Sequence, residues 1–539
     1  MSNINYQKTK ELSSRSTLLA SLTTPTIVFL VIALLMVFVV IFLRFYRIPE
    51  YLMFLSDQGR DAIILKRLVT LEKLVFVGPT TSIGNVFTGP FYYYLVAPFM
   101  WLFRLDPVGP AYAIALINSL GLVGVFGYVW RRYGKVTSLL FLTLVGLAST
   151  QIFQSRYSWN PNPVPLFTML TLIAWQKTLE TKKVRYFILS GLLFGFCLQL
   201  HYITIIILAP VVFSVFVKII KTVRNHQLQI GTARLLPTIF RSVPPTHYVL
   251  LFVSCILSFT PIILFEIKNN FINTYAFVRA FSTSEVQAKT TFFIDRLRDS
   301  CAGFINHLLL IKITGDQALI VLTIFFIVAL IFVWKQKRRN SYFIVWCVVL
   351  VITNIFALSR LEVGRHVHYF NPSYWPMYLT IAYVGNSILH IFSNRIYKGI
   401  IIIVLLIILG LYVKTQITSL YFLTDKPRIY TQVRQAKVVA QYIISQQTSD
   451  QYQVVGLPFF ETEGHYRYYL EYLKHKPMSA DSLGDPKELF VICHELAKKD
   501  CDIPGNPQWQ LADFQNKHQN WKIESTKLIE EVRVFKLVY

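Results

Sequence analysis

Charged side chains are scarce in this sequence of 539 residues. Asp, Glu, Lys and Arg together make up 15% of it, with only 28 acidic residues against 53 basic ones. Because soluble domains carry about 25% charged residues, this composition excludes a single large soluble fold. Hydrophobic residues reach 54%, and the mean hydropathy is +0.48. We therefore predict an α-helical polytopic membrane protein.

Metal-ligand spacing, a cleavable signal and internal repeats are also absent from the sequence. The six cysteines form no metal-binding pattern, although Cys493 and Cys501 can pair if their region is extracytoplasmic. The apolar run from Pro25 to Leu43 is too long for a signal peptide, and no small-residue cleavage site follows it. We predict that this run is a retained first transmembrane helix.

Long apolar runs supply the other transmembrane helices, since a span needs about 20 apolar residues. Eleven such runs lie near 25–44, 108–130, 136–154, 163–179, 186–200, 203–220, 248–266, 317–334, 341–358, 372–391 and 399–421. The fifth and sixth runs are the least separate, because only His201 and Tyr202 lie between them.

The excess of Lys and Arg lies mainly in the loops on one side of the membrane. If the N-terminal tail (1–24) is inside, the short loops on that side hold eighteen basic residues and one acid, Glu180. The loop 267–316, on the other side, has six basic residues and four acids. Because cytoplasmic loops are rich in Lys and Arg, we predict a multi-pass protein of the cytoplasmic membrane with its C-terminus outside. No dense basic run with interleaved aromatic residues occurs, so no nucleic-acid partner is expected despite the net charge of +25.

One apolar segment is assigned to a loop. Counting residues 88–104 as a span would place Arg131 outside and invert every later loop. The segment has three tyrosines and a tryptophan, which are typical of a membrane interface. We therefore predict a long first outer loop, 45–107, with an amphipathic helix at 60–73 and a membrane-hugging helix at 88–104.

Alternating polar and apolar residues replace the long runs after residue 423. The pattern predicts helices at 434–446 and 464–474, strands at 453–457 and 489–493, and two strands or a hairpin within 523–539. The expected fold is thus a domain of about eleven transmembrane helices at 25–423, followed by a small extracytoplasmic α/β domain at 424–539.

Polar residues gather at three places on the expected outer face, the first of which is Ser56–Asp61. Asp57 can take a proton from an acceptor hydroxyl or hold a divalent cation. Alternatively, Asp57 caps a helix that starts near Gln58, and Asp61 pairs with Arg60. We favour Asp57 as the functional acid, because it would precede the helix and point into a groove.

The second place, between the third and fourth expected spans, contains Arg156, Tyr157, Trp159 and Asn160. An arginine suits phosphate oxygens, and aromatic rings can stack on a sugar. The alternative is an ordinary interfacial turn.

The third place, residues 360–372, has five ionisable side chains in nine residues. Arg360 and Arg365 can bind a phosphate. The other three, Glu362, His366 and His368, could bind a metal, but their spacing matches no metal-binding motif. The alternative is a solvated loop.

Single polar residues also end two expected spans: His201 and Tyr202 follow the fifth, and Glu266 ends the seventh. A helix-end hydrogen-bonding role is the simplest interpretation of each. A charge at this depth is favoured only when it is paired or faces a cavity, so Glu266 remains a candidate site residue.

The order of these motifs resembles the membrane-embedded glycosyltransferases of the GT-C fold, most of all the bacterial branch related to protein O-mannosyltransferases and the lipid A aminoarabinose transferase. The resemblance covers residues 25–420. Its most specific stretches are SDQGRD at 56–61, GPTTSIG at 78–84, GPFYYY at 89–94, SRYSWNP at 155–161 and LHY at 200–202.

The resemblance implies transfer of a sugar from a polyprenyl-phosphate carrier to an acceptor hydroxyl on the outer face of the membrane. Asp57 corresponds to the first-loop acid of that family, as the base or the group that orients the acceptor. Arg156, Arg365 and Arg360 are the candidates for binding the lipid phosphate. The candidate substrate-binding residues are Asp61, Arg60, Tyr157, Trp159, Asn160, His201, Tyr202, Glu266, His366 and His368.

Two departures from the family concern the partners. Gln58 follows Asp57 where protein mannosyltransferases have an Asp-Glu pair, which argues against a protein acceptor over a glycan or a lipid. The loop around Arg156 lacks the acidic pair of the oligosaccharyltransferases, so no cofactor is certain. A divalent cation is a candidate, with Asp57 and Glu362 as its ligands.

A polytopic transporter or flippase for a lipid or a solute is the alternative class. Transporters usually place ionisable residues near the bilayer midplane and often contain related halves. Here the spans are poor in central charges, the ionisable groups gather on one face and no repeat is visible. The sequence therefore favours the transferase.

Overall fold

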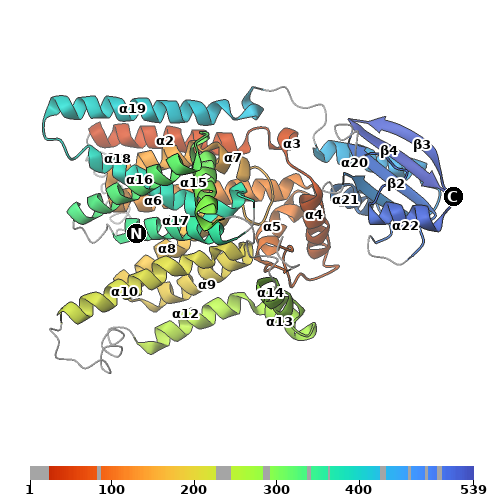
Figure 1. Ribbon diagram of the computed structural model, residues 1–539, viewed down its shortest axis with the longest axis horizontal. Coiled ribbons are helices and arrows are strands. Elements are labelled where there is room, and N and C mark those ends of the chain that lie inside the picture. Colours follow the sequence, from red (N-terminus) through yellow and green to blue (C-terminus); the bar gives the residue numbers. More distant parts are fainter. Residues whose placement is uncertain are drawn as a thin grey trace, which may run out of the picture.

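A bundle of helices forms most of the molecule, and a small α/β unit projects from one end of it (Figure 1). We call this end of the bundle the sheet-bearing end. The computed structural model describes residues 24–81, 86–225, 244–282, 292–336, 342–361, 364–424, 432–458, 463–479, 484–494 and 501–539.

All eleven predicted apolar runs overlap helices of the bundle. Its main elements are α2 (Thr24–Phe45), α6 (Val108–Leu147), α7 (Ser149–Gln154), α8 (Val164–Thr181), α9 (Val184–Leu200), η1 (Tyr202–Ile207), α10 (Leu208–Asn225), α12 (Pro245–Ser258), α13 (Thr260–Lys268), α14 (Ile272–Ser282), α15 (Phe293–Leu309), α16 (Gly315–Gln336), α17 (Tyr342–Arg360), η4 (Val367–Phe370), α18 (Asn371–Ile388) and α19 (Arg395–Thr418). In the described part of the chain, six helices are long and apolar enough to cross a membrane, or seven if the bent pair α12–α13 is one span. The polytopic character is confirmed, whereas the number eleven stays a prediction.

Helix α6 contains two of the predicted spans. Its 40 residues are broken at Gly134, whose φ of +85° lies in a region that glycine adopts without strain. The break falls within the short basic loop expected between the runs 108–130 and 136–154. A single left-handed residue therefore replaces the expected loop, and the chain is helical on both sides of it.

Two short helices lie at the sheet-bearing end, where the long first loop was expected (Figure 1). They are α4 (Ser56–Val69) and α5 (Phe91–Leu102). Twelve residues of α-helix extend about 18 Å, which is too short to cross a bilayer of about 30 Å. Both helices were predicted, but α4 begins four residues earlier than expected, because the Gln58 side chain accepts a hydrogen bond from the backbone N–H of Leu55 at 3.2 Å.

The α/β unit contains a four-stranded sheet in the order β1-β2-β4-β3. Its strands are β1 (Tyr452–Leu457), β2 (Glu488–His494), β3 (Lys522–Ile529) and β4 (Val532–Val538), and its helices are α20 (Gln432–Gln446), α21 (Gly464–Tyr472) and α22 (Trp509–Lys517). β1 runs parallel to β2, whereas β4 is antiparallel to both β2 and β3. Each element predicted for this region is confirmed. Helix α22 was not predicted.

A disulfide joins Cys493, at the end of β2, to Cys501. The other four cysteines are unpaired. Disulfides persist in oxidising compartments, so this bond supports the expected extracytoplasmic position of the unit.

We expect this disulfide to form in the cell and to stabilise the unit by about 2–3 kcal/mol, because it closes a short loop in the unfolded chain. Membranes from producing cells, denatured in SDS, should therefore add four maleimide-polyethylene glycol groups per chain before reduction and six after it. A Cys493→Ser/Cys501→Ser variant should add four under both conditions. Six additions to the unreduced wild-type protein would contradict the bond.

Candidate functional site

A cavity of about 820 Å³ lies at the sheet-bearing end, bordered by parts of α4, η1, α14 and α17. Its polar lining residues are Asp57, Arg60, Thr80, Thr81, Thr88, Trp159, Asn160, His201, Tyr202, Arg360, His366, His368 and Tyr369. Its apolar lining residues include Leu198, Ile203, Ile205, Ile206, Phe277, Ala357 and Leu358. A ligand with a polar head and a long apolar chain matches both parts.

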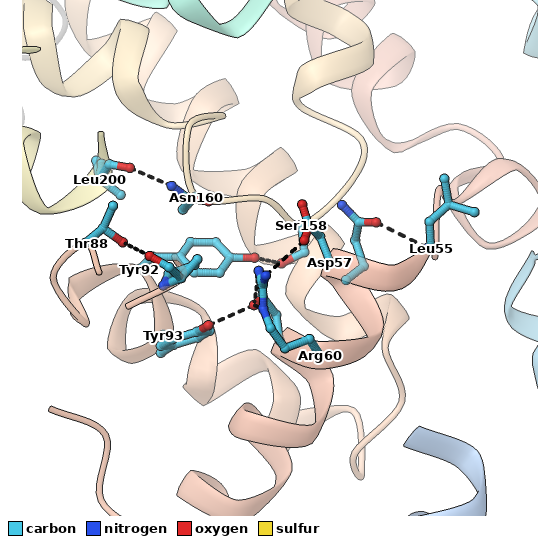
Figure 2. A network of polar contacts seen from close by, with 12 residues as sticks. Leu55, Asp57, Arg60, Thr88, Tyr92, Tyr93, Ser158, Asn160 and Leu200 are labelled. Carbon is cyan, nitrogen blue, oxygen red and sulfur yellow. Dashed lines mark hydrogen bonds and ion pairs between the residues drawn. The ribbon is translucent and has the colours of Figure 1, made fainter. Parts of the chain in front are cut away.

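Asp57 is the carboxylate of this cavity. It lies in the first turn of α4, and its side chain is 47% exposed. The sequence had suggested that Asp57 precedes the helix, and this prediction is wrong. Arg60, one turn later, donates from Nη1 to Asp57 Oδ1 at 2.9 Å, which fixes the orientation of the carboxylate (Figure 2). Within the described residues, Oδ2 of Asp57 accepts no hydrogen bond, so it can receive one from a ligand.

Asp61 has a different place from Asp57. Its side chain is 2% exposed, and Oδ1 accepts hydrogen bonds from Arg60 Nε at 3.0 Å, from Arg60 Nη2 at 2.9 Å and from the hydroxyl of Tyr93 at 2.8 Å. Burial raises the pKa of Asp61, and the charge of Arg60 opposes that rise. Asp61 is absent from the cavity lining. It acts on the cavity through Arg60, which it holds against Asp57.

Arg360 is the second cation of the cavity. Its guanidinium lies 4.4 Å from the ring centre of Phe293 and 5.3 Å from that of Phe356. No ion pair joins Arg360 to an acid within the described residues, whereas Arg60 is shared by two carboxylates. Arg360 is thus the cavity cation whose charge is available to an anionic ligand.

Three histidines form one wall of the cavity. The rings of His201 and His366 lie 5.7 and 5.9 Å from that of His368, and Trp159 packs edge-on against His368 at 4.7 Å. Burial lowers the pKa of His201 to about 4. Burial, followed by the two neighbouring imidazoles, lowers the pKa of His368 to about 3. At neutral pH these two rings are therefore uncharged hydrogen-bonding groups.

Two of the predicted phosphate-binding arginines lie away from the cavity lining. Arg156 is 5% exposed; it donates to the carbonyl oxygen of Leu43 at 2.9 Å and stacks on Phe422 at 3.7 Å. Arg365 is half-buried, and its Nη1 donates to the carbonyl oxygen of Leu361 at 3.3 Å. Of the three candidates, only Arg360 lines the cavity.

Tyr157 and Glu266 are also absent from the cavity lining. Tyr157 lies behind Trp159, with 6.2 Å between the ring centres. Glu266 is buried and accepts hydrogen bonds from the backbone N–H groups of Asn273 and Thr274 at 3.0 and 2.8 Å. Its carboxylate thus satisfies unpaired N–H groups at the start of α14, which is the helix-end role considered first.

The described parts of the Gly/Pro/Thr loop, 78–81 and 86–88, are held in place by Tyr202 and by Asn273, of which the sequence singled out only Tyr202. Asn273 accepts a hydrogen bond from the Phe87 N–H at 2.6 Å and donates to its carbonyl oxygen at 3.3 Å, and Tyr202 donates to the same oxygen at 2.6 Å. This anchor places Thr80, Thr81 and Thr88 on the cavity. No local pattern marks Asn273, because its partner lies 186 residues away.

The described residues contain no group of three or more His, Cys, Asp or Glu side chains that could hold a metal ion. Glu362 lies outside the described residues. A cation held by Asp57 and Glu362 therefore stays a prediction.

Comparison with known proteins identifies the fold. No protein-family model matches the sequence, and a search of curated protein sequences finds no match. The structure is similar to ArnT from Cupriavidus metallidurans, both bound to undecaprenyl phosphate (12% identity, TM-score 0.54) and in the apo state (11% identity, TM-score 0.55). Each match covers 95% of this chain and 97% of that chain. The chain therefore has the GT-C fold of ArnT, as its sequence motifs had suggested.

Proposed function

We propose that the protein transfers a sugar from a polyprenyl-phosphate donor to an acceptor hydroxyl at the outer face of the cytoplasmic membrane. The main support is the cavity, where an oriented carboxylate and a cation with no acidic partner among the described residues share a chamber with an apolar wall. The polyprenyl chain cannot leave the hydrocarbon region, so its phosphate must be met at the membrane surface. The likeness to ArnT, which was crystallised with undecaprenyl phosphate, supports a ligand of this kind.

In the proposed reaction the acceptor hydroxyl donates a hydrogen bond to Asp57, and its oxygen attacks the anomeric carbon of the sugar. The new C–O bond forms as the bond between that carbon and the phosphate oxygen breaks. Asp57 takes the hydroxyl proton, and the electron pair of the broken bond leaves on the polyprenyl phosphate. Arg60 holds the carboxylate towards the cavity through its 2.9 Å hydrogen bond, so the base needs little reorganisation.

The departing phosphate gains negative charge, which preset hydrogen-bond donors and cations stabilise. Arg360 supplies the cation, and the imidazoles of His366 and His368 supply further donors on the same wall. The apolar residues of η1 and α17 accommodate the start of the polyprenyl chain. If a divalent cation binds, Asp57, the acid among the cavity-lining residues, would hold it. The cation would then help to stabilise the negative charge of the phosphate.

The function is tested by reconstitution. Purified protein in proteoliposomes is given a polyprenyl-phosphate donor with a radiolabelled sugar, together with an envelope lipid, a glycan or a protein as acceptor. Transfer of label that depends on both donor and acceptor would support the proposal. Flux of the intact lipid across the sealed vesicle without a new glycosidic bond would instead establish the transporter class.

We expect Arg360→Gln to lower kcat/KM for the donor by about 10- to 100-fold, because a charge-assisted hydrogen bond contributes about 1.5–3 kcal/mol. Initial rates over a donor titration give this ratio. Arg365→Gln is the matched control, since Arg365 lies in the next loop but not on the cavity, and its kcat/KM should stay within about two-fold of wild type. The reverse order of effects would assign the phosphate to Arg365.

A further inference from the structure

Helix α21 of the α/β unit packs directly on α4, the helix that carries Asp57 (Figure 1). The contact is made at two glycines. A Cβ added to Gly59 would lie 2.1 Å from the backbone nitrogen of His465, and a Cβ added to Gly464 would lie 2.6 Å from the carbonyl oxygen of Ser56. Real Cβ atoms do not approach other atoms this closely, so either side chain would push the two backbones apart.

The close contact surrounds the functional acid. A Cβ on Gly464 would lie 3.2 Å from the backbone nitrogen of Arg60 as well as near Ser56. These two residues flank Asp57 on α4. The backbone that sets the position of Asp57 and of its partner Arg60 is therefore in van der Waals contact with the α/β unit.

Charged groups hold the same two helices together about two turns further on. Glu471 of α21 accepts from Arg67 Nη2 at 2.6 Å and Nε at 3.0 Å, and from Lys66 Nζ at 3.2 Å. The Glu471 side chain is only 10% exposed, so this pairing is screened less by solvent than a surface ion pair is. The two-point Arg67 contact also fixes the rotation of one helix relative to the other.

Aromatic residues complete the contact at the start of α4. Phe54 packs edge-on against the rings of His465, Tyr468 and Tyr469, with centres 6.0 to 6.3 Å apart. Its backbone N–H donates to the side chain of Gln432 in α20 at 2.7 Å. The segment that leads into Asp57 is thus fixed by two helices of the α/β unit.

We propose that the α/β unit positions the acid of the transferase, through Gly464 and Glu471 of α21 acting on α4. This proposal rests on the proposed function. No residue of α21 lines the cavity, so these are positioning residues and touch no substrate. Asp57 lies on α4 and Arg360 lies on α17. By fixing α4, the α/β unit therefore sets the distance between these two residues across the cavity.

The test combines kinetics with a measurement that needs no activity. In Gly464→Ala we expect kcat to fall about ten-fold or more, because a misplacement near 1 Å can cost about 100-fold in rate, while undecaprenyl phosphate binds within about two-fold of wild type. Amide hydrogen exchange of residues 56–69 should become faster. Glu471→Gln, which leaves the backbone contact intact, should give a smaller change of the same kind. Gly410→Ala is the control, since an added Cβ there meets nothing within 4 Å.

Each outcome decides the proposal. Unchanged exchange in α4, or faster exchange with a wild-type kcat, would overturn the positioning role while leaving the transferase in place. A loss of lipid binding as large as the loss of kcat would indicate general damage to the bundle and would also overturn it. If the wild-type protein transfers no sugar, the proposed function fails, and the exchange of α4 then decides alone whether α21 fixes that helix.

Discussion

Asp57→Asn is expected to lower sugar transfer by about 1,000-fold, while undecaprenyl phosphate binds as tightly as to wild type. The amide keeps the size of the side chain and can still accept a hydrogen bond from Arg60, but it cannot take the acceptor proton. General-base catalysis contributes about 100- to 10,000-fold. Single-turnover transfer of labelled sugar in proteoliposomes measures the loss, and equilibrium binding of the lipid phosphate measures what is retained.

The matched control is Asp61→Asn. Asp61 lies one turn further along the same helix, 2% exposed and outside the cavity. The oxygen of its amide variant can still accept the hydrogen bonds of Arg60 and Tyr93, so Arg60 stays in place and the variant should retain most of the wild-type rate once the protein is folded. If Asp61→Asn abolishes transfer and Asp57→Asn does not, the roles of the two acids are reversed. Full activity in Asp57→Asn would remove Asp57 from the mechanism.

The fold was predictable because its strongest determinants are local. Runs such as 25–44 and 399–421 are apolar over most of their length, and tyrosines and prolines mark the segment 88–104 as different from them. The number of membrane-spanning helices was harder to predict from the sequence. Gly134 lies between two predicted spans as a single left-handed residue, and α12 and α13, which fall within one predicted span, meet at a bend of 58°. Neither break is visible in the sequence as a loop.

The site was predictable only in part, because the tertiary structure decides which side chains point into the cavity. Asp57 and Arg360 were selected from charged clusters and do line the cavity. Arg156 was selected by the same argument, yet it stacks on Phe422, 266 residues further along the chain. Nothing near Arg156 in the sequence distinguishes a phosphate ligand from a buried arginine that carries its own aromatic partner.

The role of the α/β unit was hidden for the same reason. Gly59 lies within Ser56–Asp61, the stretch for which the sequence predicts contact with an acceptor or a cation. The structure instead places the backbone of His465 at that position. Long-range backbone contacts leave no periodic signal in either segment, so only the folded chain shows that residues of the C-terminal unit bear on the first loop.

Arg60→Met is expected to lower both stability and rate, because Arg60 has two carboxylate partners. Without the guanidinium, buried Asp61 keeps the Tyr93 hydroxyl as its only described hydrogen-bond donor. Leaving a buried charged group under-satisfied costs about 1–3 kcal/mol. The denaturation midpoint of the purified protein, followed with a thiol-reactive dye that reads the buried cysteines, should therefore fall.

The effect of Arg60→Met on rate has a separate cause and can be separated by a second change. Asp57 loses the 2.9 Å hydrogen bond that orients it, and transfer should fall by about 100-fold. In Arg60→Met/Asp61→Asn the buried charge is gone, so the midpoint should return towards wild type while the rate stays low. Recovery of both would show that Arg60 serves only to neutralise Asp61. A low midpoint in the double variant would instead mean that Arg60 stabilises the protein by packing.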